Sequence, residues 1–226
     1  SGTVDLASNS QAFASLIFNG TYSGGVNNMQ YSRYVEGHDS GNGAWDLIGP
    51  PLNGMSISTF ITSNDDLDDN PSNNDFGIGP YSNTAGWPAY ATSDVDFTNF
   101  TVGTGYQMAT TSGSNVEFKG TLSTSAVNVT IVSNETDPYN SGGNTRFNLV
   151  ANPYPSFINA NSNADGTNNV IDVNGTSNLH DSYLYVYGDD ADNSNGSLFT
   201  IINNTTAATY IAPGQAFMVA ADNASS

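Results

Sequence analysis

The sequence predicts an all-β protein made of two tandem β-sandwich domains of the jelly-roll kind, at residues 1–115 and 116–226. Three observations support this prediction: a sequence repeat, segments in which apolar and polar residues alternate, and a composition rich in turn-forming residues. Asp, Asn, Ser, Thr and Gly dominate, and these residues favour turns and are poor helix formers. The length of 226 residues suits two domains of ordinary size.

Three short patterns occur twice, in the same order. Residues 18–22 (FNGTY) return at 118–122 (FKGTL), residues 45–51 (WDLIGPP) at 147–153 (FNLVANP), and residues 103–108 (GTGYQM) at 214–219 (GQAFMV). Several aromatic, Gly and Pro positions match across the three pairs, which is hard to obtain by chance. A tandem repeat favours a modular protein over a single catalytic domain.

Strand candidates follow one another along the whole chain. In 127–131 (VNVTI) apolar and polar residues alternate, and in 183–187 (YLYVY) three tyrosines share one face while Leu184 and Val186 share the other. The one competing helical segment, Ser8 to Leu16, is short and poorly capped. Many short strands between Gly, Asn and Pro turns predict a sandwich or barrel. In chain order the candidates are 13–18, 29–35, 47–48, 95–97, 106–108, 127–131, 147–150, 183–187, 199–202 and 217–219.

The charge balance excludes some classes of partner. Asp and Glu total 21 against 3 Lys and Arg, a formal charge of -18. Nucleic acids and anionic membrane surfaces both require clustered cations, so neither is expected as a partner. No apolar run approaches the length of a membrane span, and the chain has no cysteine for a disulfide or a thiolate metal site. Divalent cations and neutral glycans remain open.

A family resemblance is carried by 148–156 (NLVANPYPS) followed by 212–219 (APGQAFMV). This pattern resembles repeats in large cell-surface and secreted proteins of the Bacteroidota, which commonly precede a type IX secretion sorting domain. Residues 45–51 and 103–108 look like the partner repeat. The resemblance implies an extracellular, cell-surface location and says little about activity. The chain departs from the family pattern at Ala151 and Ala216, where Gly is usual.

Two acidic loops have the composition of calcium sites. Calcium takes six to eight oxygen ligands, which alternating Asp and Asn residues can supply. Neither loop has the full spacing of a known calcium loop, so solvated acidic loops remain the alternative. If calcium is bound, the predicted ligands are Asp65, Asp66, Asp68 and Asp69 in the first loop and Asp189, Asp190 and Asp192 in the second.

A Gly- and Pro-rich loop, residues 80–90, gathers three aromatic side chains: Tyr81, Trp87 and Tyr90. Ring faces cover the apolar side of a sugar, and loops often carry function. The three residues are therefore predicted to bind carbohydrate, with burial of Trp87 in the core as the alternative.

No catalytic constellation is recognisable. His38 and His180 each precede an aspartate, but adjacent residues on a strand point apart, and three scattered glutamates are few for a glycosidase. The sequence therefore predicts a non-enzymatic, extracellular structural or adhesive surface protein. The alternative is a carbohydrate-binding module of a secreted protein that acts on polysaccharides.

The position of the repeated strands within each domain bears on assembly. Residues 16–35 are the counterpart of 116–132. If these strands open each domain, both domains are complete and the protein can be a monomer. If they close each domain, the second domain has an unfilled edge, which another copy could fill by donating a strand. Such a head-to-tail contact does not close, so it would build a filament.

Overall fold

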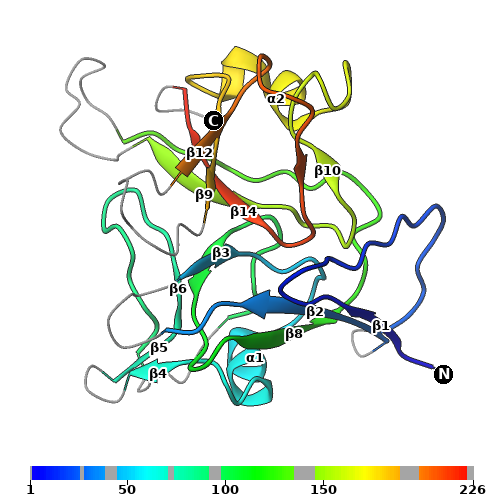
Figure 1. Ribbon diagram of the computed structural model, residues 1–226, viewed down its shortest axis with the longest axis vertical. Coiled ribbons are helices and arrows are strands. Elements are labelled where there is room, and N and C mark those ends of the chain that lie inside the picture. The colour runs from blue at the N-terminus through cyan, green and yellow to red at the C-terminus, as the bar shows by residue number, and fades with distance from the viewer. Residues whose placement is uncertain are drawn as a thin grey trace.

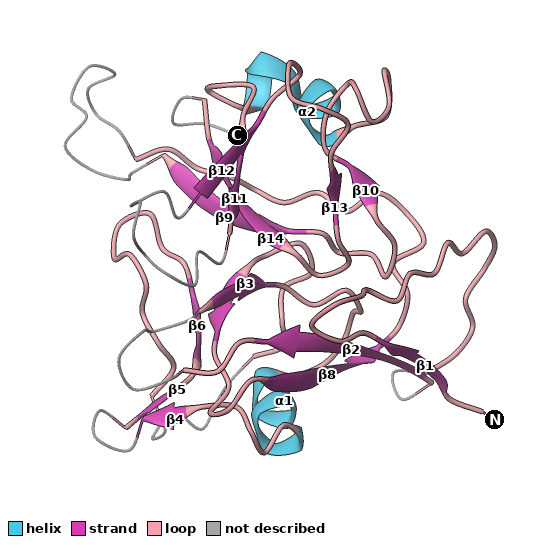
Figure 2. Ribbon diagram, viewed as in Figure 1, coloured by secondary structure: helices cyan, strands magenta, loops and turns pink. Residues whose placement is uncertain are grey.

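The computed structural model describes residues 2–25, 28–38, 45–70, 74–91, 98–134, 146–188 and 199–222, and the described part is an all-β protein with two short helices. Figures 1 and 2 show the strands in the middle of the molecule and the helices α1 and α2 at opposite ends of its long axis. The elements are β1 Val4–Ala7, β2 Met29–Val35, β3 Asp46–Ile48, α1 Ile57–Ser63, β4 Asp69–Asn70, β5 Asp75–Phe76, β6 Ile78–Pro80, β7 Tyr106–Met108, β8 Ser114–Gly120, β9 Phe147–Ala151, β10 Ile158–Asn159, α2 Val170–Asn178, β11 Leu184–Tyr187, β12 Phe199–Ile202, β13 Tyr210–Ile211 and β14 Ala216–Ala220.

The described strands form several small sheets. Their orders are β1-β2-β8, β3-β7-β6, β12-β11-β14-β9, β10-β13 and β4-β5. The largest core cluster packs under the first half of the chain, around Phe60, Met108 and Phe118, and the second packs around Leu184, Ile211 and Phe217. No helix among the described residues is long and apolar enough to cross a membrane.

Two of the three sequence repeats are also structural repeats. β3 pairs with β7, and β9, which carries the second copy of the β3 pattern, pairs with β14, which carries the second copy of the β7 pattern. The registers agree: Ile48 lies opposite Tyr106, and its counterpart Val150 lies opposite Phe217. We call β3, α1, β6 and β7 the first unit and β9, α2, β11, β12 and β14 the second unit.

The equivalence extends to elements with little sequence likeness. β6 pairs with β7 as β11 pairs with β14, so Gly79 corresponds to Tyr185 and Tyr81 to Tyr187. Each unit also places a helix between its first two strands. Both helices begin at a polar cap: the Ser56 side chain accepts a hydrogen bond from the Thr59 amide, and Asn169 accepts one from the Asp172 amide.

The two units meet through a reciprocal contact. The Gly49 amide donates to the Gly214 carbonyl at 2.9 Å, and the equivalent Ala151 amide donates to the Gly103 carbonyl at 2.7 Å. Isolated bridges join Ile48 to Gln215 and the equivalent pair Val150 to Thr104. A residue and its counterpart exchange the same bond in both directions, as in an interface between two symmetric subunits. The contact is therefore a pseudo-twofold one inside a single chain.

Glycines make this close approach possible. A Cβ on Gly49 would collide with the Ala151 side chain and lie 2.5 Å from the Thr104 carbonyl oxygen. A Cβ on Gly105 would lie 2.8 Å from the Ala216 Cβ and 2.5 Å from Leu149. Gly49 faces Ala151 and Gly105 faces Ala216, so each facing pair holds one Gly and one Ala. Packing therefore explains why the second copy of the repeat has Ala at these two positions.

The first repeat pattern is not a structural repeat. Residues 118–120 are the end of β8, where Phe118 is buried, and Thr121 then bridges Asn53, whereas residues 18–22 lie outside any strand and Phe18 is exposed. The predicted boundary between residues 115 and 116 falls inside β8, which pairs with β2 and contributes Val116 and Phe118 to the first core cluster. A boundary there would divide a strand of that core.

Most strand predictions are confirmed, and two of the described segments differ. Residues 13–18 form no strand, and residues 95–97 lie outside the described part. Residues 127–131 keep the predicted alternation of burial but join no sheet. Neither observed helix was expected. Both are short, and their capping residues resemble the many other Ser and Asn residues of the loops.

We expect Gly49→Ala to destabilise the protein by about 1–3 kcal/mol, because the added methyl has no space at the contact between the units. Chemical denaturation measures this change. Adding Ala151→Gly should restore part of the loss, since it removes one of the two collisions. Gly166→Ala is the matched control because a Cβ there meets no atom within 4 Å. Equal stability of Gly49→Ala and Gly166→Ala would contradict the packing argument.

Candidate functional site

A tight turn brings together two of the three predicted carbohydrate-binding residues. The Ser82 amide donates to the Gly86 carbonyl at 2.8 Å, and the Gly86 amide donates back to the Ser82 carbonyl at 2.7 Å. Gly86 adopts a φ of 77°, a conformation that favours glycine. Tyr81 and Trp87 therefore stand at the two ends of the turn, with ring centroids 4.7 Å apart and an angle of 61° between the rings.

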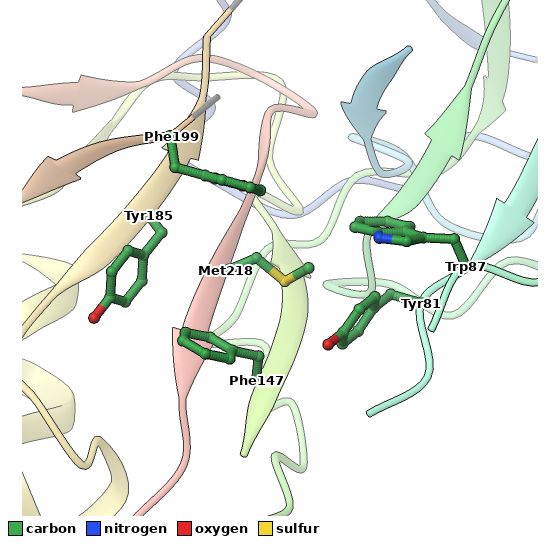
Figure 3. A pocket seen from close by; sticks show the side chains of 6 residues that line it. All are labelled: Tyr81, Trp87, Phe147, Tyr185, Phe199 and Met218. Atoms are coloured by element: carbon green, nitrogen blue, oxygen red, sulfur yellow. The ribbon is translucent and has the colours of Figure 1, made fainter. Parts of the chain in front are cut away.

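The second unit supplies the other side of the site. Phe147 of β9, Tyr185 of β11, Phe199 of β12 and Met218 of β14 join Tyr81 and Trp87 around a pocket of about 250 Å³. Figure 3 shows Met218 near the middle, with Tyr81 and Trp87 on one side and Tyr185 and Phe199 on the other. Five of the six lining side chains are aromatic.

The turn is fixed in place on both sides. The Gln107 side-chain amide donates to the carbonyls of Trp87 and Pro88, at 3.4 and 3.3 Å. The Asn83 side-chain amide donates to the Val132 carbonyl at 3.0 Å, and Asn134 donates to Asn83 at 2.7 Å. These bonds tie the loop to β7 and to the segment that leads into β9, so the pocket walls are preformed.

The pocket offers aromatic ring faces and no charged group. Burial raises the pKa of Tyr81, and burial followed by the nearby Asp181 and Tyr183 raises the pKa of Tyr185. Both phenols therefore stay protonated at neutral pH. None of the six lining residues carries a charge. Trp87 is 41% exposed, so its ring is open to a ligand and is not part of the core.

Tyr90 lies elsewhere. It packs against the first core cluster, and its backbone bonds to Phe76 and Ile78 place it beside β5 and β6. Burial, and then the neighbouring Tyr106, raises the pKa of Tyr90 to about 12. Proximity in sequence grouped Tyr90 with Tyr81 and Trp87, but the chain turns it towards the core.

Sequence reasoning missed the four residues from the second unit. The alternation in 183–187 was a usable signal, because Leu184 and Val186 pack in the second core cluster while Tyr185 and Tyr187 lie on the opposite face. What could not be read from the sequence was that this face meets the Tyr81–Trp87 turn across the contact between the units.

The predicted calcium ligands of the first loop are divided among other partners. Asp66 accepts a hydrogen bond from the Ser112 hydroxyl at 3.0 Å, and Asp68 lies 3.3 Å from the His38 ring nitrogen. Within the described residues no three acidic or His side chains are grouped as a metal site. Asp65 and Asp69 are exposed. Asp189, Asp190 and Asp192 lie outside the described residues, so calcium binding stays a prediction.

Comparison of the chain with protein-family models, with curated proteins and with solved structures finds no match. The geometry of the pocket is therefore the basis on which a function can be inferred.

A bound calcium ion would raise the melting temperature, because a ligand of the native state stabilises it by mass action. Thermal unfolding in calcium and in chelator measures the effect. The variant with Asp65→Asn and Asp69→Asn should reduce the calcium-dependent rise if the first loop holds the ion. Equal melting temperatures of the unaltered protein in the two buffers would exclude a structural site.

Neutral Tyr90 should stabilise the fold up to alkaline pH. Its folded-state pKa of about 12 exceeds the ordinary value of 10.0, so this contribution is fully present below pH 10 and is lost as the pH rises through 12. Urea unfolding across this range should show a smaller loss of stability in Tyr90→Phe, which has no phenol to ionise. Identical pH dependence of the two proteins would contradict burial of this hydroxyl.

Proposed function

We propose that this chain is a non-enzymatic, extracellular adhesive module that holds one ring of a neutral carbohydrate in the pocket between its two units. The observation that carries this proposal is the meeting of Tyr81 and Trp87 with four further apolar side chains around one cavity. Ligand sites are commonly concave and largely apolar, with a few polar groups that set orientation.

The size and charge of the site favour this class of ligand. Its volume of about 250 Å³ is just below the roughly 300–1,000 Å³ found for sites of drug-sized ligands, which suits a single sugar ring. A ligand with a negative charge would be repelled by a protein with a formal charge of -18. An uncharged ring with one apolar face matches the aromatic walls.

We also propose a domain organisation and a protein family for this module. The two units are tandem β-sandwich domains, with the first extending through β8, and the chain is kin to the type IX secretion surface repeats of the Bacteroidota. The support is the pair of matching strand registers together with the resemblance of residues 148–156 and 212–219. A surface protein of this kind would use the pocket for attachment to glycans and not for catalysis.

A glycan array probed with the purified chain tests the proposal. We expect saturable binding to neutral glycans, and Trp87→Ala should weaken it by about tenfold or more, because stacking on the indole is lost. Trp87 is largely outside the core, so the variant should keep its melting temperature. Tyr210→Ala is the matched control, since Tyr210 is a 52% exposed aromatic residue that does not line the pocket.

Fluorescence gives a second readout. The chain has two tryptophans, so Trp45→Phe leaves Trp87 as the sole indole. A glycan that stacks in the pocket should change the emission of this variant and not that of Trp87→Phe. Binding that survives Trp87→Ala unchanged, or no binding to any glycan, would overturn the proposed function.

A further inference from the structure

The internal pseudo-twofold relation identifies a segment of the second unit that corresponds to β2. In the first half, the Glu36 amide donates to the Asp46 side chain at 2.8 Å. The equivalent residue of β9, Asn148, accepts a hydrogen bond from the Val132 amide at 3.0 Å. Val132 therefore corresponds to Glu36, and residues 125–131 correspond to β2.

This segment has the form of a strand, but within the described residues no strand pairs with it. Val127, Val129 and Ile131 are buried or half-buried, while Asn128 and Thr130 are exposed. Its ends are held by side chains: the Val127 amide donates to the Tyr154 hydroxyl, and Val132 bonds to Asn148. Between them, the backbone groups of 128–131 make no hydrogen bond to any described residue. We call residues 127–132 the open edge.

In the first half the corresponding edge is filled. β8 pairs antiparallel with β2 over seven residues, so that Arg33 lies opposite Val116 and Tyr31 lies opposite Phe118. Val116 and Phe118 are fully buried. The strand that fits the open edge should therefore run antiparallel to it and carry apolar residues at every second position.

The N-terminal arm has the sequence of such a strand. Residues 14–22 (ASLIFNGTY) correspond to residues 114–122 (SNVEFKGTL), which places Leu16 at the position of Val116 and Phe18 at that of Phe118. The arm nevertheless forms no strand, and Ile17 and Phe18 are 78% and 41% exposed. An exposed apolar segment of this kind is a candidate for contact with a partner.

The arm already contacts residues near Tyr154, whose hydroxyl holds one end of the open edge. The Leu16 amide donates to the Pro155 carbonyl at 2.6 Å, and Phe13 packs edge-on against Phe157 with ring centroids 6.2 Å apart. Pro155 corresponds to Asn53, whose carbonyl in the first half accepts from Thr121, just after β8. The pairing would continue an interface that exists in the structure. Residues 121–134 and 6–32 also carry no charged side chain, which limits repulsion between two acidic chains.

From these observations we propose that residues 14–22 of a second copy of this chain add to the open edge as an antiparallel strand. The arm of the same chain is held between β1 and β2, which pair with each other. It bonds to Pro155 through Leu16, whereas the register of β8 would require a bond through Thr21, the counterpart of Thr121. A second copy can enter in the register of β8. Each chain would donate one arm and accept another, so the contact is heterologous and extends into a filament. The proposal does not depend on the aromatic pocket.

Cysteine cross-linking tests the register directly, because the chain has no cysteine of its own. The pairing of Arg33 with Val116 transfers to Val129 and Leu16. A mixture of the Leu16→Cys and Val129→Cys proteins, mildly oxidised, should give a disulfide-linked heterodimer on a non-reducing gel. Ile17→Cys mixed with Val129→Cys is the matched control, since a shift of one residue turns the side chain to the other face.

The controls distinguish the two possible occupants of the open edge, the arm of a second copy and the arm of the same chain. Each single variant oxidised alone reports accidental linkage, and the double variant Leu16→Cys with Val129→Cys at high dilution reports pairing within one chain. A heterodimer from Leu16→Cys that clearly exceeds that from Ile17→Cys supports the proposal. Equal yields, no heterodimer, or an intramolecular disulfide in place of a heterodimer would overturn it.

Sedimentation of the full chain gives an independent readout. The unaltered protein should form larger species as its concentration rises, and added salt should favour them by screening the charge of -18 on each copy. Leu16→Asp combined with Phe18→Asp should abolish this assembly, whereas Ile17→Asp should preserve it. Nonspecific apolar association would instead be most sensitive to Ile17, the most exposed of the three, and that result would overturn strand donation.

Discussion

The structure depends on a reciprocal contact between the two units. The end of β3 contacts the turn that leads into β14, and the end of β9 contacts the turn that leads into β7. Two hydrogen bonds, from Gly49 to Gly214 and from Ala151 to Gly103, cross between the units in equivalent positions. The backbones come this close because each facing pair contains one glycine. The contact sets the position of the second sheet relative to the first, and so it sets everything that is built from both.

The pocket lies where the twofold relation breaks down. In the first unit, Gly79 has no side chain, so the Pro88–Ala89 backbone can lie over it, and the Gln107 side-chain amide holds this segment through the carbonyls of Trp87 and Pro88. The corresponding residues of the second unit are Tyr185 and Met218, which project into the cavity. In the first unit the loop that carries Trp87 therefore covers its own sheet. In the second unit the equivalent sheet face carries aromatic side chains, and the same loop packs beside that face to form the pocket.

Local pattern predicted the class of the protein and most of its strands. The tyrosine alternation in 183–187 and the two motif pairs at β3, β7, β9 and β14 required only side-chain periodicity and turn residues. The helices were missed because their caps, Ser56 and Asn169, are common residues in this chain. The strand expected at 127–131 shows the limit of such reasoning: periodicity reports which side chains face the core, but a strand also needs a neighbour. Tyr90 and the four residues of the second unit that line the pocket depended on contacts far apart in sequence.

The central claim is that the two units form one cooperative structure through their reciprocal bonds. Native-state hydrogen exchange at the Gly49 and Ala151 amides tests it most directly. We expect both amides to exchange equally slowly and only by global unfolding, with the same dependence on denaturant as amides in the middle of β9 and β14. Fast exchange at both amides, or protection of one without the other, would contradict a symmetric contact that joins the units.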